Sequence, residues 1–211
     1  MADRYLEAAA VSAGAPAVNG IWPNGLAARY FKQFGDARRL LDVGCGIGEL
    51  GRCQPSSEVE VHGVDINAAA VKLAARHENV ICLDLDSSAL PYEDESFDAV
   101  LVKDILEHVR YPERLACEIH RVLRRGGVLV ASVVMARPKR VWADYTHVRG
   151  FTRSAARQLL EDAGLPVEAI WRMGAVPLSG RLHLIWLVPQ LLRLPLFDEL
   201  WAASWELRAR K

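Results

Sequence analysis

Short apolar runs alternate with amphipathic stretches along residues 26–134. The apolar runs predict strands over 40–43, 59–64, 80–85, 97–102 and 128–134. Helical periodicity and glycine stop signals predict helices over 26–34, 68–76 and 112–123. Strands that alternate with helices are typical of βαβ units. We therefore expect an α/β fold: a Rossmann-like, doubly wound, mostly parallel sheet with helices on both faces.

The pattern is less regular after residue 136. It predicts a helix over 152–163 with Thr152 as its N-cap, a strand over 167–171 and a final helix over 201–210. The run 183–197 is the most hydrophobic of the chain, but Pro189 and Pro195 interrupt it. We expect it to pack as a C-terminal cap or to form a dimer contact. A hydrophobic acceptor site or a membrane-surface contact is the alternative.

Composition narrows the possible partners. Among the 211 residues, 26 basic side chains balance 26 acidic ones, so nothing attracts nucleic acid over a long range. The four cysteines form no C-x-x-C pair, so we expect free thiols, no metal site and a reducing compartment. Residues 1–10 lack a secretory pattern. No apolar run reaches the about 18–20 residues of a spanning helix, and we expect a cytoplasmic protein.

A glycine loop follows the first predicted strand. Its glycines are Gly44, Gly46 and Gly48. Such a loop lets a ligand approach backbone N–H groups. Counted from Gly46, the spacing also fits a dinucleotide fingerprint. Asp42 and Glu49 bracket the loop and would repel a pyrophosphate, which favours a nucleoside without phosphates, such as S-adenosylmethionine (SAM).

Acidic residues follow the next two predicted strands. Asp65 can accept hydrogen bonds from ribose hydroxyls, and Asp84 or Asp86 can accept one from an adenine amino group. The alternative for each is a solvated turn or a helix cap. Because ligands bind at the carboxyl ends of strands in such sheets, we predict ligand contact for this set.

Five ordered segments resemble the class I SAM-dependent methyltransferase family, in its small-molecule and glycan-tailoring type. They are LDVGCGIG (41–48), GVDI (63–66), the run from Asp86 to Val100, LEHV (106–109) and RVLRRGG (121–127). One departure is Arg125, where proline is usual. The resemblance implies SAM as cofactor, S-adenosylhomocysteine as product and no metal. From the length of the chain we expect one domain over 1–211: N-terminal helices or a lid (1–36), a SAM-binding core (37–136), and an acceptor-side loop with the cap (137–211).

The resemblance also implies site residues. In the family, the glycine loop passes the methionine part of SAM, the acid after the second strand binds the ribose, and the next acid reaches the adenine. Asp84 is the alternative residue for the contact with adenine. Trp22 and Tyr30 would either cover the cofactor as a lid or pack in the core. The implied cofactor-binding residues are Asp42, Gly44, Cys45, Gly46, Gly48, Asp65, Ile66, Asp86, Ser87 and Lys103, with Asp104 beside them.

A candidate base lies in the segment 144–152, DYTHVRGFT, which resembles a segment of the same tailoring enzymes. His147 can take a proton from an acceptor hydroxyl. The alternative is that His147 and Asp144 only hold the loop in place. Methyl transfer can also proceed mainly by positioning the nucleophile. We expect His108 to cap or pack a helix.

We therefore predict a SAM-dependent methyltransferase that acts on an oxygen or nitrogen of a small-molecule, glycan or lipid-linked acceptor. An RNA or protein methyltransferase is an alternative, but the neutral charge argues against it, and we expect the basic run at 137–140 to be solvated. A non-catalytic SAM-binding protein and a nicotinamide oxidoreductase are further alternatives.

Overall fold

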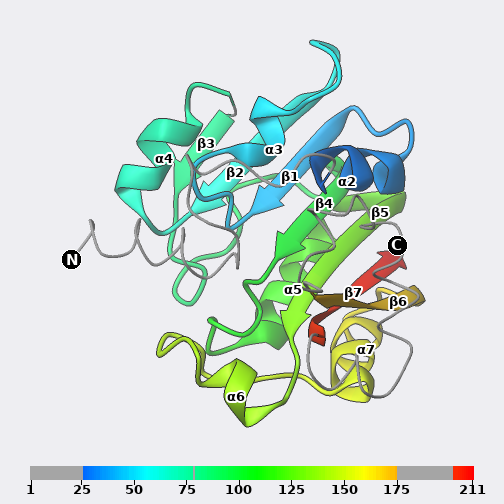
Figure 1. Cartoon of the computed structure of the whole chain (residues 1–211). Coiled ribbons are helices and arrows are strands. Elements are labelled where there is room, and N and C mark those ends of the chain that lie inside the picture. Colours follow the sequence, from blue (N-terminus) through cyan, green and yellow to red (C-terminus); the bar gives the residue numbers. More distant parts are fainter. Residues whose placement is uncertain (1–25, 78, 175–201) are drawn as a thin grey trace, which may run out of the picture.

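The computed structural model describes residues 26–77, 79–174 and 202–211, and these residues form one seven-stranded sheet (Figure 1). Its strands are β1 (Arg39–Val43), β2 (Glu60–Asp65), β3 (Asn79–Cys82), β4 (Phe97–Lys103), β5 (Leu123–Val134), β6 (Val167–Gly174) and β7 (Ala202–Arg210). The helices are α2 (Leu26–Phe34), α3 (Glu49–Arg52), α4 (Ala68–Ala74), α5 (Pro112–Val122), α6 (Pro138–Val141) and α7 (Arg153–Asp162).

The strand order is β3-β2-β1-β4-β5-β7-β6. Neighbouring strands from β3 to β5 are parallel, so their carboxyl ends meet at one edge of the sheet. The chain passes from β1 outward to β3 and then returns to place β4 on the other side of β1. A ligand crevice is expected at such a switch point. The predicted doubly wound, mostly parallel fold is confirmed.

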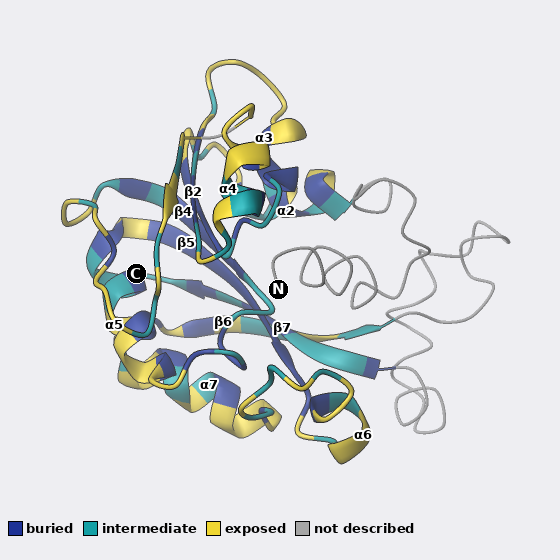
Figure 2. Cartoon of the chain, turned by 90° about the vertical axis from the view of Figure 1, so that its left-hand side faces the viewer, coloured by how far each residue is buried: buried dark blue, intermediate teal, exposed yellow. Residues whose placement is uncertain are grey.

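Alternate residues of each strand enter two different cores, because successive strand side chains point to opposite faces. Leu41 and Val43 of β1 pack with residues of α5 and α7. Leu40 packs on the other face with Tyr30 and Phe34 of α2. Helices therefore cover both faces of the sheet, as Figure 2 shows. Tyr30 is a buried core residue and not an exposed lid.

The helix expected over 201–210 is wrong, because Ala202–Arg210 forms strand β7. This strand runs antiparallel to β5 from Val128↔Arg210 to Val134↔Ser204, and it also pairs with β6. Ala, Glu, Leu and Arg favour helices in isolation, but β5 offers an unpaired edge that only a strand can satisfy. The alternation Leu207-Arg208-Ala209-Arg210 was the available strand signal.

Other boundaries differ by smaller amounts. β3 ends at Cys82 instead of the predicted residue 85. β5 begins at Leu123, five residues before the predicted start at residue 128. The Thr152 cap is confirmed, since its side chain accepts a hydrogen bond from the Ala155 N–H at 3.1 Å. Trp22 and the run 183–197 lie outside the described residues. Within the described ranges, no helix is long and apolar enough to cross a bilayer.

Candidate functional site

The glycine loop closes over the carboxyl ends of β1 and β2. The N–H groups of Gly44 and Cys45 both donate to the Val64 carbonyl, at 2.8 and 3.1 Å. The Gly46 N–H donates to Oδ2 of Asp65 at 2.8 Å. The glycine loop and the acid that ends β2, two motifs that are separate in the sequence, therefore form one unit.

Two glycines of the loop serve different purposes. Gly46 has φ +54°, and a Cβ added there would meet no atom within 4 Å, so its outer side is open to a ligand. Gly48 has φ +82°, and its Cβ would lie 2.8 Å from the Ala74 Cα, so this glycine lets α3 pack against the end of α4. Both positions favour glycine by conformation, but only Gly46 leaves free space.

Asp65 keeps capacity for a ligand. Its Oδ1 accepts from the Asn67 N–H at 2.8 Å while Oδ2 holds Gly46, and the side chain is half-buried. Each carboxylate oxygen has two acceptor positions, so ribose hydroxyls can still donate to this group. Ile66 follows with 61% of its surface exposed, which provides an apolar face for a nucleobase. These residues fit the nucleoside end of SAM.

The acids after β3 lie in a turn. Asp84 accepts from the Asp86 N–H at 2.9 Å and from the Ser87 hydroxyl at 3.0 Å. Asp86 accepts from the Arg110 N–H at 2.7 Å. Ser87 thus contacts Asp84 rather than Asp86. Asp86 instead joins this turn to the segment after β4.

A partly buried group of charges lies where the methionine end is expected. Lys103 pairs with Asp104, whose Oδ1 accepts from the Ser132 hydroxyl at 2.7 Å. Burial lowers the pKa of Lys103, but Asp104 outweighs this effect and the pKa lies above its usual range. Asp42 is buried close enough to act on Lys103 as well. Acidic side chains here favour a cationic group such as a sulfonium.

Glu107 is a buried acid that sequence analysis missed. Its Oε1 accepts from the Val134 N–H at 3.0 Å, and within the described residues Oε2 has no hydrogen-bond partner. Burial, with Asp104 nearby, raises the pKa of Glu107 to about 8. The available signal was a single acid between apolar residues, in Leu106-Glu107-His108-Val109.

We expect Glu107 to make the stability of the protein depend on pH. Between its unfolded value of 4.5 and about 8, the folded chain holds a proton that the unfolded chain has released. The free energy of unfolding should therefore fall as the pH rises through this window. Glu107→Gln keeps an acceptor for Val134 and should flatten this part of the profile. Urea unfolding across the window measures it, with exposed Glu113→Gln as the control, and an unchanged slope in Glu107→Gln would contradict the assignment.

Two histidines meet beside the carboxyl end of β5. The rings of His108 and His147 are 4.6 Å apart. His147 Nδ1 lies 2.8 Å from the Val141 carbonyl and donates to it, which leaves Nε2 unprotonated in the neutral ring. Thr146 joins Asp144 to His108, at 2.6 and 3.0 Å. Both histidines were candidates from the sequence, but this chain of contacts was not predicted. Burial and the neighbouring His147 lower the pKa of His108.

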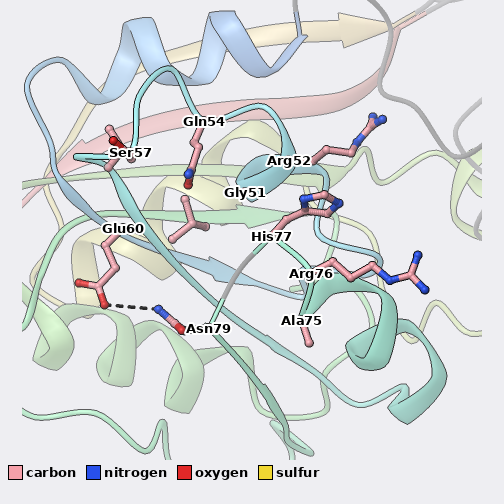
Figure 3. A pocket seen from close by; sticks show the side chains of 11 residues that line it. Gly51, Arg52, Gln54, Ser57, Glu60, Ala75, Arg76, His77 and Asn79 are labelled. Atoms are coloured by element: carbon pink, nitrogen blue, oxygen red, sulfur yellow. Dashed lines mark hydrogen bonds between the residues drawn. The ribbon is translucent and has the colours of Figure 1, made fainter.

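A pocket of about 510 Å³ lies at the amino ends of β2 and β3, opposite the carboxyl ends that carry the glycine loop (Figure 3). Glu60 and Asn79, the first residues of β2 and β3, line it together with Arg52, Arg76 and His77. It therefore lies away from Asp65 at the other end of β2 and is not the predicted site. Among the described residues, no group of three or more His, Cys, Asp or Glu side chains is placed to hold a metal.

Comparison with known proteins supports this assignment of motifs. The family model for a methyltransferase domain matches residues 41–131. The phosphoethanolamine N-methyltransferase 2 of Caenorhabditis elegans is 34% identical over 129 residues, which cover 55% of this chain and 29% of that protein. A ubiquinone biosynthesis O-methyltransferase of Maricaulis maris is 32% identical over 46% of this chain and 40% of its own length.

A third relative, phthiotriol/phenolphthiotriol dimycocerosates methyltransferase 1 of Mycobacterium ulcerans, is 40% identical over 44% of this chain and 36% of its own length. The chain thus spans less than half the length of these curated relatives.

Solved structures share the fold. A SAM-dependent methyltransferase from Archaeoglobus fulgidus has a TM-score of 0.68 at 21% identity, over 87% of this chain and 90% of that one. The cyclase SpnF has a TM-score of 0.67 at 22% identity, over 99% and 93%. Since one neighbour is a cyclase, the fold alone does not define the reaction. Residues 41–131, which carry the ordered motifs, match the family model for a methyltransferase domain, so this part of the chain is similar to methyltransferases.

Proposed function

We propose that this chain binds SAM at the glycine loop and transfers its methyl group to an oxygen or nitrogen of a small-molecule, glycan or lipid-linked acceptor. The observation that carries the proposal is the unit formed by Gly46, Asp65 and Ile66 at the switch point of the sheet. The relatives support it, because their names describe O- and N-methyltransferases. No metal is required for this assignment.

Different residues of the site would bind different parts of SAM. Asp65 would hold the ribose, Ile66 would cover one face of the adenine, and Asp86 would accept from the adenine amino group. Asp42 and the loop around Cys45 would hold the methionine part, near Lys103. When bound, SAM supplies a methyl group on a cationic sulfur. The sulfur keeps the electron pair of the broken carbon–sulfur bond, and S-adenosylhomocysteine is the leaving group.

His147 would act as the general base. Donation from Nδ1 to the Val141 carbonyl leaves Nε2 free to take the proton of an acceptor hydroxyl. The neutral ring of His108 lies beside it and would add no charge that opposes proton uptake. Positioning of the acceptor against the sulfonium would supply the remaining rate increase.

Transfer of a tritiated methyl group from SAM to a panel of phenols, amines and lipid-linked alcohols tests the function. We expect turnover on at least one class, and the absence of turnover on every class despite SAM binding would favour a non-catalytic SAM-binding protein. Salt-sensitive RNA binding with RNA methylation would favour the RNA alternative.

With an acceptor identified, His147→Gln should lower kcat by about a hundredfold with little change in KM for SAM, because proton transfer by a placed base contributes on this scale. Steady-state kinetics with the identified acceptor measure both constants. His77→Gln, exposed at the opposite edge of the sheet, is the matched control. An unchanged kcat in His147→Gln would assign the loop a purely structural role.

A further inference from the structure

The segment 138–148, between β5 and α7, exposes its aromatic side chains. Tyr145 is 91% exposed, Trp142 67% and Val148 48%. Large apolar side chains seldom gather on a free surface within so short a stretch, and such gatherings mark contact sites. In Figure 2 this segment, around α6, lies at the lower border of the molecule with exposed residues on its outside.

The exposure is not the result of a loose loop. Three polar side chains of the segment are held by hydrogen bonds: Asp144 accepts from the Thr146 N–H at 2.9 Å, His147 donates to the Val141 carbonyl, and the Thr146 hydroxyl lies 3.0 Å from His108 Nδ1. The Val148 N–H donates to the Glu107 carbonyl at 2.9 Å. The segment therefore holds its aromatic residues outward on a backbone that its own polar groups fix.

The sequence around this segment is basic although the chain as a whole is neutral. Residues 136–150 contain four basic side chains, Arg137, Lys139, Arg140 and Arg149, and one acid. That acid, Asp144, is hydrogen-bonded to Thr146. Lys139 is exposed beside Trp142 and forms no ion pair with any described residue. The outer face of the segment thus combines an indole, a phenol and an unneutralised ammonium group.

We propose that the segment 138–148 docks on the surface of an anionic lipid bilayer. Trp and Tyr place an apolar ring and a polar tip at the level of the lipid headgroups, and basic residues beside them attract anionic headgroups. The local positive charge favours this occupant over a second copy of the neutral chain. Docking here would bring the His147 side of the molecule to the membrane, but the proposal does not depend on methyl transfer.

Sedimentation with vesicles tests the proposal on the full chain. The vesicles are phosphatidylcholine alone and phosphatidylcholine mixed with phosphatidylglycerol, and the variants are Trp142→Ala/Tyr145→Ala and Lys139→Glu. Trp171→Ala, a 37% exposed tryptophan on β6, is the matched aromatic control. Circular dichroism and light scattering monitor folding and oligomeric state in parallel.

We expect wild type and Trp171→Ala to bind the anionic vesicles more tightly than the neutral ones. The aromatic double variant should lose at least about tenfold in partitioning, since binding scales with the apolar area that is buried. Lys139→Glu should lose about tenfold on anionic vesicles only. Equal binding by wild type and the double variant, or no binding by wild type, would overturn the proposal. A wild-type dimer that the double variant converts to monomer would assign the face to self-association instead.

Discussion

Asp65→Ala should weaken SAM binding by about a thousandfold while the protein stays folded. The carboxylate would lose two hydrogen bonds from ribose hydroxyls, and bonds to a charged group contribute about 1.5–3 kcal/mol each. It would also release the Gly46 N–H, which it holds at 2.8 Å, so the loop would lose its fixed position. Isothermal titration calorimetry with SAM and S-adenosylhomocysteine measures the change.

The opposite end of the same strand offers the control. Glu60 begins β2, is exposed and lies in the pocket at the amino edge of the sheet. Glu60→Gln removes one negative charge from the same strand but should leave SAM affinity unchanged. A similar loss in both variants would mean that charge or stability, and not ribose binding, explains the effect of Asp65→Ala.

Gly48→Ala should destabilise the fold by about 3 kcal/mol, whereas Gly46→Ala should cost only about 1 kcal/mol, because both adopt positive φ but only Gly48 is obstructed. The added methyl group at Gly48 would meet the Ala74 backbone at 2.8 Å, which cannot move without shifting α4. At Gly46 the methyl group would point into open space. That space is where the ligand would approach, so Gly46→Ala should still lose SAM affinity by at least about tenfold.

Urea unfolding and calorimetry on the same two variants separate the effects. The expected pattern is a large loss of unfolding free energy with Gly48→Ala and a selective loss of binding with Gly46→Ala. Equal destabilisation by both variants would show that Gly46 also faces the protein. Full SAM affinity in Gly46→Ala would show that the ligand does not approach this side of the loop.

The sheet from β1 to β5 could be predicted because its determinants are local. β1, β4 and most of β5 are buried on both faces and read as continuous apolar runs, and glycines and caps mark the helix ends. β7 could not be predicted in this way. Its residues favour a helix by propensity, and only the distant edge of β5 makes them a strand. The end of β3 was misplaced because Leu83 and Leu85 continue the apolar pattern beyond the last paired residue, Cys82.

In the candidate site, too, the features set by local sequence could be predicted, whereas those set by contacts between distant segments could not. Gly46, Asp65 and Ile66 lie at or shortly after the carboxyl ends of β1 and β2, so the order of motifs along the chain was sufficient to place them together. The chain of contacts from Asp144 through Thr146 to His108 joins distant parts of the sequence, since Thr146 and His108 are 38 residues apart. No spacing rule predicts such a contact. The burial of Glu107 depends on β5 and on the loop at Val148, which the sequence places far from it.

Calorimetric titration of the wild-type chain with SAM, S-adenosylhomocysteine and NAD tests the proposed cofactor site most directly. We expect saturable binding of SAM and S-adenosylhomocysteine at one site per chain and no binding of NAD. Binding of NAD in place of SAM would contradict the proposed site and would favour the dinucleotide interpretation of the spacing from Gly46.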